Sequence, residues 1–319
     1  MRAVVALVVL LAACAASAQT YPTKPIRLVV GFAPGGAADI IARTMSDPLT
    51  RALGQGVIVD NKPGAGSSLA AEFVAKSAPD GYTIMIASQS GMIVNPLINK
   101  NVGYDTVRDF APITQVTSSP LVVAVNPSLP VSSIRELIVV AKKAPGKLNF
   151  ATSGNGSLPH LATALFDALA GIEMVHVPYK SGGQSVQSVL AGDTQVTFAT
   201  SPSVMPLVQA GRLRGLAVTT RARSPLIAGL PGMEEAGLGN YNLSIWYGFF
   251  APAGTPRDIV KRLFDATVQA LKDARLKEIL ARDGTETAAS RSPEDFAAFL
   301  REDAGVIARV IRETGAKFD

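Results

Sequence analysis

The sequence has few of the residues that carry covalent and metal chemistry. Its 319 residues include one cysteine, Cys14, and two histidines, His160 and His176. One cysteine cannot form an intrachain disulfide, and zinc needs three or four ligands, usually His or Cys. We therefore predict no metal site and no cofactor. His176 lies within an apolar strand pattern, and we expect it to be structural.

Aromatic residues and clustered charges are also scarce. Phe, Trp and Tyr make up 6% of the residues, and no basic run is longer than Lys142–Lys143. The formal net charge of +5 comes from scattered Lys and Arg side chains that are not interleaved with aromatic ones. Because nucleic-acid-binding proteins gather basic residues on one face, we predict no nucleic-acid partner. A weak positive field still favours small anions.

No motif of a hydrolase or a nucleotide-binding protein is complete. The Gly-x-Ser-x-Gly elbow of serine hydrolases does not occur. Gly64–Ser68 begins like a dinucleotide-binding loop, but Leu69 stands at the third glycine position. Because we find no convincing nucleophile–base pair, we predict that the protein is not an enzyme. An enzyme that acts on small acids stays open as an alternative.

The N-terminal residues have the pattern of an export signal. Arg2 precedes the apolar run Ala3–Ala13, and Ala16-Ser17-Ala18 matches an A-x-A cleavage site. The apolar run is too short to cross a bilayer as a permanent helix. We predict that residues 1–18 are a signal peptide and that the mature protein is periplasmic. Leu11–Cys14 also resembles a lipoprotein signal, so a lipid anchor at Cys14 stays open.

Apolar, β-branched runs alternate with helical segments along the rest of the chain, which is typical of the α/β fold class. The expected strands are Ile26–Gly31, Val57–Asp60, Tyr82–Ser88, Leu121–Asn126, Leu148–Ala151, Met174–Pro178, Gln195–Ala199, Leu213–Thr219 and Ser244–Ala251. Several helix ends are also readable. The expected N-caps are Ser133, Thr255 and Ser292, and the expected C-terminal glycines are Gly54 and Gly171.

Two long extended stretches indicate how the chain divides. They are Ile113–Asn126 and Leu243–Pro252. A chain that leaves one domain, builds a second and returns to the first needs two such crossings. We therefore predict one lobe from residues 22–121 and 243–319 and a second from residues 122–242. The helices after about Pro256 should pack against the first lobe.

The loop Phe32–Asp39 joins the first expected strand to the first expected helix. A helix start has unpaired N–H groups and a positive dipole end, so the loop suits an anion. Gly31 and Gly36 have the spacing of a phosphate loop, but Ala37 occupies the lysine position, which favours reversible binding over phosphate transfer. The predicted anion-binding residues are Phe32, Ala33, Gly35, Gly36, Ala37, Ala38 and Asp39.

Polar, glycine-containing loops follow other expected strands, at the edge where open α/β sheets bind ligands. Each loop alone could be a solvated turn. Hydroxyl and backbone N–H groups can nevertheless bind a carboxylate without a salt bridge. Taken together, the loops predict one shared cleft, lined by Ser88, Ser90, Ser153, Gly154, Asn155, Ser157, His160, Tyr179, Ser181, Gly182 and Thr200.

In this order, several segments resemble the extracytoplasmic solute receptors of tripartite tricarboxylate transporters, the Bug family. The segments are Pro34–Asp39, Val59–Gly66, Asp80–Thr83, Asp109–Ile113, Pro145–Phe150, Ser153–Ser157, Val177–Lys180, Trp246–Pro252 and Gly254–Pro256. The resemblance implies a monomeric, two-lobe periplasmic binding protein (type II) that closes on a small organic carboxylate. Its partners would be the subunits of a membrane transporter. A receptor that signals to a different partner is the alternative.

The resemblance also implies that the loops 32–39 and 153–160 hold a ligand carboxyl group through amides, hydroxyls and bridging waters. Asp39 matches a common acid of the family, and we expect it to cap the first helix or fix the loop. This chain departs from the family pattern at Pro159, Ser181 and Ala199, where Ser, Gly and Asp are frequent. These departures lie at the predicted cleft, so they concern the identity of the carboxylate, which the sequence does not tell.

Overall fold

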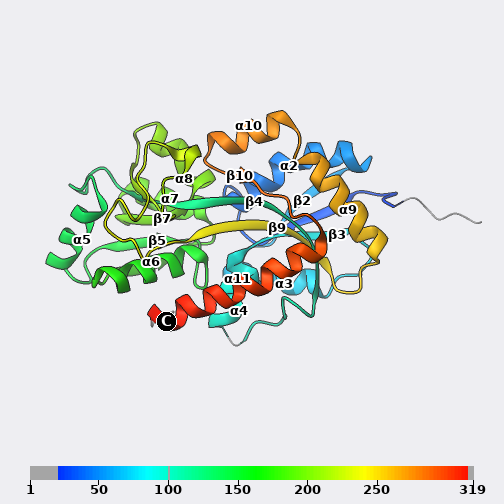
Figure 1. Ribbon diagram of the computed structural model, residues 1–319, viewed down its shortest axis with the longest axis horizontal. Helices are drawn as coiled ribbons and strands as arrows, with labels where there is room; N and C mark the ends of the chain where they lie inside the picture. The colour runs from blue at the N-terminus through cyan, green and yellow to red at the C-terminus, as the bar shows by residue number, and fades with distance from the viewer. Residues whose placement is uncertain (1–20, 100, 315–319) are drawn as a thin grey trace, which may run out of the picture.

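The computed structural model describes residues 21–99 and 101–314, so the predicted signal peptide and Cys14 lie outside the described residues. The described chain forms two α/β lobes that are joined by long strands (Figure 1). Within these ranges, no helix combines the length and the apolar character that crossing a membrane requires.

The first lobe is built on a sheet whose strands are β1 (Ile26–Val30), β2 (Val57–Asn61), β3 (Thr83–Ser88) and β9 (Ser244–Pro252). β1 lies between β2 and β3 in parallel pairings, and β9 runs antiparallel beside β3. Its connections contain α2 (Ala37–Leu53), η1 (Ala65–Ser67), α3 (Ser68–Ala75), η2 (Ser90–Val94) and α4 (Asn95–Ile98). The residues Leu28–Val30 of β1 are fully buried, as expected for a strand covered on both faces.

The strand β4 (Phe110–Val125) belongs to both lobes. Its residues 110–120 pair with β9, and its residues 121–125 pair with β7 (Val196–Thr200). Figure 1 shows β4 and β9 side by side across the middle of the molecule. The two sheets are therefore continuous through a single strand.

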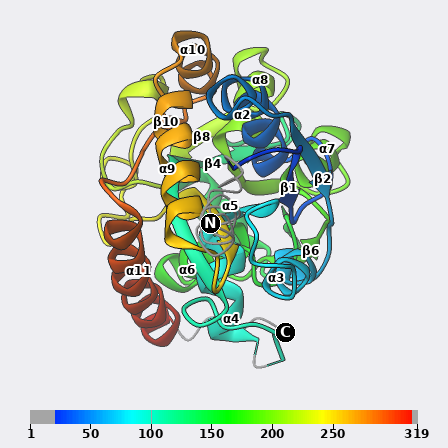
Figure 2. The same ribbon diagram turned by 90° about the vertical axis from the view of Figure 1, so that its right-hand side faces the viewer.

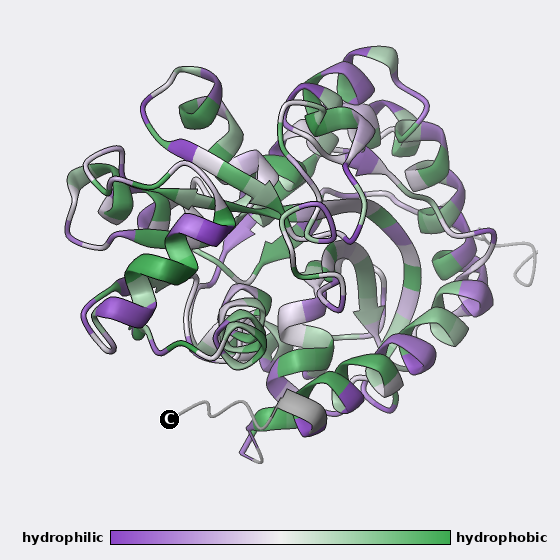
Figure 3. Ribbon diagram, turned by 60° about the vertical axis from the view of Figure 1, so that its left-hand side comes forward, coloured by the Kyte–Doolittle hydropathy of each residue, from purple (hydrophilic) through white to green (hydrophobic). Residues whose placement is uncertain are grey.

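The second lobe has its own open sheet. β5 (Asn149–Thr152) runs parallel to β6 (Val175–Pro178) and to β7, while β8 (Arg214–Val218) runs antiparallel to β4. Its helices are α5 (Ile134–Lys143), α6 (Leu158–Ala170), α7 (Gly182–Ala191), α8 (Ser201–Gln209) and η3 (Pro225–Ile227). Figure 3 shows the helices striped with hydrophobic and hydrophilic positions, as expected for helices that cover a sheet with one face.

The chain ends with α9 (Arg257–Ala270), α10 (Ala274–Arg282), β10 (Glu286–Thr287) and α11 (Pro293–Thr314). α9 and α10 pack against α2 of the first lobe, as expected, and α9 and α11 lie along one edge of the molecule (Figure 2). α11 differs from the expectation because it also packs against α6 of the second lobe. With 22 residues, α11 is about 33 Å long, so it extends past the first lobe.

Most of the predicted helix ends are confirmed. Ser133 and Ser292 accept hydrogen bonds from the N–H groups of Glu136 and Asp295, and Gly54 and Gly171 adopt left-handed backbone conformations. The predicted cap at Thr255 is wrong. Its hydroxyl donates to the Pro252 carbonyl at 2.7 Å, and α9 begins at Arg257. Because α9 begins one residue later than a cap at Thr255 requires, the N-cap position falls on Pro256, whose side chain cannot accept a hydrogen bond.

Candidate functional site

A pocket lies between the lobes, at the ends of β1, β3, β5 and β7. Of the predicted residues, those that line it are Phe32, Gly36, Ala37, Ala38, Ser88, Ser90, Ser153, Gly182 and Thr200. Further lining residues that the predicted set did not contain are Pro159, Ser185, Ala199, Ile245 and Tyr247. The pocket therefore collects residues from both lobes, as the shared-cleft hypothesis requires.

Four helices begin at this pocket: α2, α6, α7 and α8. In α6 and α7, the caps Ser157 and Ser181 accept hydrogen bonds from backbone N–H groups at 3.3 Å. α2 and α8 have no side-chain cap at Gly36 and Thr200. Because the N-terminus of a helix carries partial positive charge, these helix starts favour an anion in the pocket, although none of the described residues that line it is cationic.

The remaining predicted residues surround the pocket. Gly154 and Asn155 form the turn before α6, and Gly35 and Tyr179 lie in an open groove at the rim. The N–H of Ala33 donates to the Lys180 carbonyl of the other lobe at 3.3 Å. These positions hold or close the pocket, and they do not line it.

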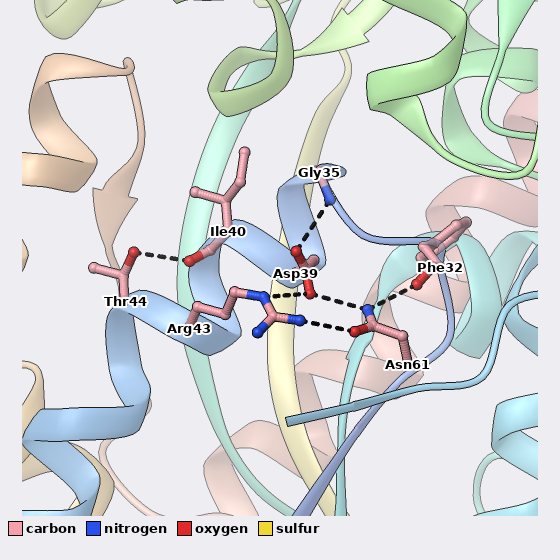
Figure 4. Close-up of polar contacts among 7 residues, drawn as sticks. All are labelled: Phe32, Gly35, Asp39, Ile40, Arg43, Thr44 and Asn61. Carbon is pink, nitrogen blue, oxygen red and sulfur yellow. Dashed lines mark hydrogen bonds and ion pairs between the residues drawn. The ribbon is translucent and has the colours of Figure 1, made fainter. Parts of the chain in front are cut away.

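Asp39 fixes the loop before α2 (Figure 4). Its side chain is 5% exposed and accepts hydrogen bonds from the Gly35 N–H at 3.0 Å, Arg43 Nε at 2.9 Å and Asn61 Nδ2 at 3.0 Å. Asn61 Nδ2 also donates to the Phe32 carbonyl. Burial raises the pKa of Asp39, but the hydrogen bonds from Arg43, Gly35 and Asn61 outweigh it, so the pKa lies below its ordinary value.

We expect Asp39→Ala to lower the free energy of unfolding by about 2 kcal/mol at pH 7, because buried donors lose their acceptor. The pKa of Asp39 is lower in the folded than in the unfolded protein, so its carboxylate stabilises the fold fully above the unfolded-state pKa. This stabilisation is lost as the pH falls through the folded-state pKa. The deficit should therefore shrink in acid. Urea unfolding at pH 7 and pH 3 measures the loss of stability. The control is Asp47→Ala, at an exposed site on α2. An equal deficit at both pH values would contradict this explanation.

The two histidines contact each other, and neither lines the pocket. Their rings stack with centroids 3.8 Å apart, and the ring of Phe150 stacks on His176. Burial lowers the pKa of His160 to about 3 and that of His176 to about 4, so both are neutral at pH 7. His176 Nε2 lies 2.6 Å from the Thr152 hydroxyl, which agrees with a structural role. His160 was predicted to line the cleft, but its ring packs against His176 instead.

Two buried hydroxyl groups face the pocket from the first lobe. Ser88 is 1% exposed, and its Oγ has no hydrogen-bond partner among the described residues. Burial raises the pKa of Tyr247 well above its ordinary value, although a hydrogen bond with Thr200 opposes this, so the phenol stays protonated. Both groups can donate to an anion. Tyr247 and Ile245 occupy alternate positions of β9, so their shared face could have been predicted from the strand period.

The lobes are in contact on two sides of the pocket. On one side, a Cβ atom at Gly183 would lie 2.6 Å from the Gly35 carbonyl oxygen. On the other side, Ser90 Oγ accepts from the Leu158 N–H at 2.9 Å. The space open to the centre of a water molecule is about 20 Å³, room for about one water. The lobes are therefore in contact on both sides of the pocket, and little free space remains between them.

Among the described residues, no group of three or more His, Cys, Asp or Glu side chains is placed to hold a metal ion. A pocket between two α/β lobes, surrounded by helix N-termini, defines a periplasmic binding protein. More particularly, the chain belongs to the tripartite tricarboxylate transporter family receptors, whose family model matches residues 41–316. The family resemblance and the two-lobe fold are thus confirmed.

Relatives cover nearly the whole chain. BugT of Bordetella pertussis (strain Tohama I) is 35% identical over 302 residues, which are 94% of this chain and 92% of BugT. A solved periplasmic transporter is 39% identical with a TM-score of 0.90, over 94% of this chain and all of that one. R. palustris Rpa4515, solved with adipate, is 34% identical with a TM-score of 0.89, over 92% and 98% of the two chains.

Proposed function

We propose that this protein captures a small organic carboxylate in the periplasm and delivers it to the membrane subunits of a tripartite tricarboxylate-type transporter. The observation that carries this proposal is the pocket, in which four helix N-termini and buried hydroxyls converge and which none of the described charged side chains lines. The family and the adipate bound by a relative point to the same ligand class. The residues 32–39 and 153–160 are proposed to hold a carboxyl group of the ligand.

Capture works by hinge closure. The moving bodies are the predicted lobes, residues 22–121 with 243–319 and residues 122–242, and β4 and β9 lead between them. A carboxylate that touches α2 from one lobe and α7 or α8 from the other binds the closed form better, and this differential affinity shifts the population toward closure. The receptor is proposed to act as a monomer after its signal peptide is removed, and lipidation at Cys14 is the alternative anchor.

Binding without turnover is the proposed chemistry. The pocket holds hydroxyl groups, but both histidines lie outside its lining, so no general base accompanies a nucleophile there. A receptor that signals instead of feeding a transporter would use the same pocket. The proposal favours transport because the matching family model is that of a transporter receptor.

Thermal unfolding with a panel of carboxylates tests the proposal. A ligand present at 100 times its Kd should add about 2.7 kcal/mol of stability. Mass spectrometry after incubation should recover the ligand unchanged. If sugars or cations stabilise the protein and no carboxylate does, the proposal fails.

A further inference from the structure

We infer that the turn at residues 64–67 and the side chain of Asn95, both in the first lobe, position the turn at residues 154–158 of the second lobe for ligand capture. This inference rests on the proposed function, in which residues 153–160 hold a carboxyl group of the ligand. Neither residues 64–67 nor Asn95 line the pocket. They are positioning residues, which act through the segments that they contact.

The turn at residues 64–67 has a backbone conformation that L-amino acids rarely adopt. The φ angles of Ala65, Gly66 and Ser67 are 47°, 62° and 83°, and only glycine takes such values without strain. Ser67 is also 1% exposed, and no described group forms a hydrogen bond with its Oγ. Strained residues persist only where the surrounding structure holds them, and they gather at functional sites.

The turn is held by two segments of the first lobe that reach the pocket. A Cβ atom at Gly31 would lie 1.9 Å from Ser67 Oγ, and one at Gly91 would lie 3.1 Å from the same atom. Gly31 directly precedes the loop 32–39, and Gly91 directly follows Ser90 of the pocket lining. The turn therefore packs against the backbone that carries pocket residues, although it does not reach the pocket itself.

Asn95 joins this turn to the second lobe. It is 3% exposed, and its Nδ2 donates to the Ala65 carbonyl at 2.9 Å and to Ser68 Oγ. These hydrogen bonds fix the amide, so its Oδ1 lies against the second lobe, where a Cβ atom at Gly156 would be only 2.8 Å away. One side chain thus holds one turn with its amide nitrogen and contacts the other with its amide oxygen.

Two further contacts join the lobes at the same place. A Cβ atom at Gly66 would lie 2.7 Å from the Asn155 carbonyl oxygen, and the Leu158 N–H donates to Ser90 Oγ at 2.9 Å. All these contacts are lost when the lobes separate, so they stabilise the arrangement in which both lobes touch one ligand. Because they lie outside the pocket, their loss lowers the population of this arrangement by one factor for every ligand.

Asn95→Asp tests the inference by calorimetric titration with a panel of carboxylates. Aspartate has the size of asparagine but places an oxygen, in place of a donor, against the Ala65 carbonyl. We expect each carboxylate that binds the unmodified protein to bind about tenfold more weakly, by a factor common to the panel. Asn99→Ala, an exposed asparagine directly after α4, is the control and should leave the affinities unchanged.

Hydrogen exchange of the ligand-free protein gives a second readout that needs no ligand. The backbone amides of residues 154–158 should exchange at least threefold faster in Asn95→Asp and at the original rate in Asn99→Ala. If Asn95→Asp does not fold, Ile98→Ala replaces it. This variant removes the Cδ1 atom that would lie 3.2 Å from a Cβ at Gly156, and it should change affinity and exchange in the same direction.

An affinity or an exchange rate that stays unchanged in the folded variant overturns the inference. A loss of affinity that differs more than threefold between carboxylates overturns it as well, because the side chain then acts on the ligand itself. If no carboxylate binds the unmodified protein, the proposed function fails. The exchange rates then still decide whether Asn95 holds the turn at residues 154–158.

Discussion

Gly183→Ala should weaken ligand binding by roughly 5- to 150-fold, because overpacking costs about 1–3 kcal/mol. The added Cβ would lie 2.6 Å from the carbonyl oxygen and 3.0 Å from the carbonyl carbon of Gly35, in the other lobe. Both atoms are backbone, so the lobes cannot close without a shift. The open form has no such clash, and alanine in α7 favours the helix by about 0.5–1 kcal/mol.

The melting temperature of the ligand-free protein should therefore stay equal or rise while affinity falls. Calorimetric titration with the best-binding carboxylate and thermal unfolding without ligand measure the two effects. Gly305→Ala on α11 is the matched control, because no atom lies within 4 Å of the Cβ it would add. If Gly183→Ala binds as tightly as the unmodified protein, the contact between Gly35 and Gly183 is not part of the closed, ligand-bound state.

Asp303→Ala should lower the free energy of unfolding by about 3 kcal/mol, since two buried donors, Gln89 Nε2 and Trp246 Nε1, lose their acceptor. Gln89 and Trp246 are each 3% exposed, so water does not replace the carboxylate. The loss should also weaken ligand binding. Gln89 lies between Ser88 and Ser90 in the chain, and Trp246 lies between Ile245 and Tyr247, all four of which line the pocket.

Urea unfolding and carboxylate titration of the same variants measure both effects. Asp303→Asn keeps one oxygen acceptor, and its loss of stability should be smaller than that of Asp303→Ala. Burial raises the pKa of Asp303, so a neutral replacement also relieves part of a desolvation cost. Glu302→Ala, an exposed neighbour on α11, is the control and should change neither quantity. Equal effects of Asp303→Ala and Glu302→Ala would contradict this role of Asp303.

Local patterns predicted the parts of the site that are local in the chain. The run Ile26–Gly31 and the loop Phe32–Asp39 became β1 and the start of α2, because strand propensity, a glycine-rich turn and a helix start follow one another directly. The same reasoning located the turn before α6. Each of these depends on neighbours a few residues away, and short-range sterics and hydrogen bonding determine them.

Positions that depend on distant segments were not predictable in this way. The ring of His160 follows a polar loop, but its place against His176 depends on the packing of α6 on the sheet. Ile245 and Tyr247 line the pocket because β9 pairs with β3 and β4, which are far away in the sequence.

The sequence by itself determined the α/β class and the anion-favouring loop, because these follow from residue periodicity and from the chemistry of helix starts. Its motifs also led to the receptor family, which the family model confirmed. The tertiary structure alone decided that four helix N-termini meet in one pocket, whose lining within residues 21–99 and 101–314 has no charged side chain. It also decided that Gly183 meets Gly35 across the cleft. The charge around a ligand and the contacts between the lobes both depend on segments that are distant in the chain. Only folding brings these segments together.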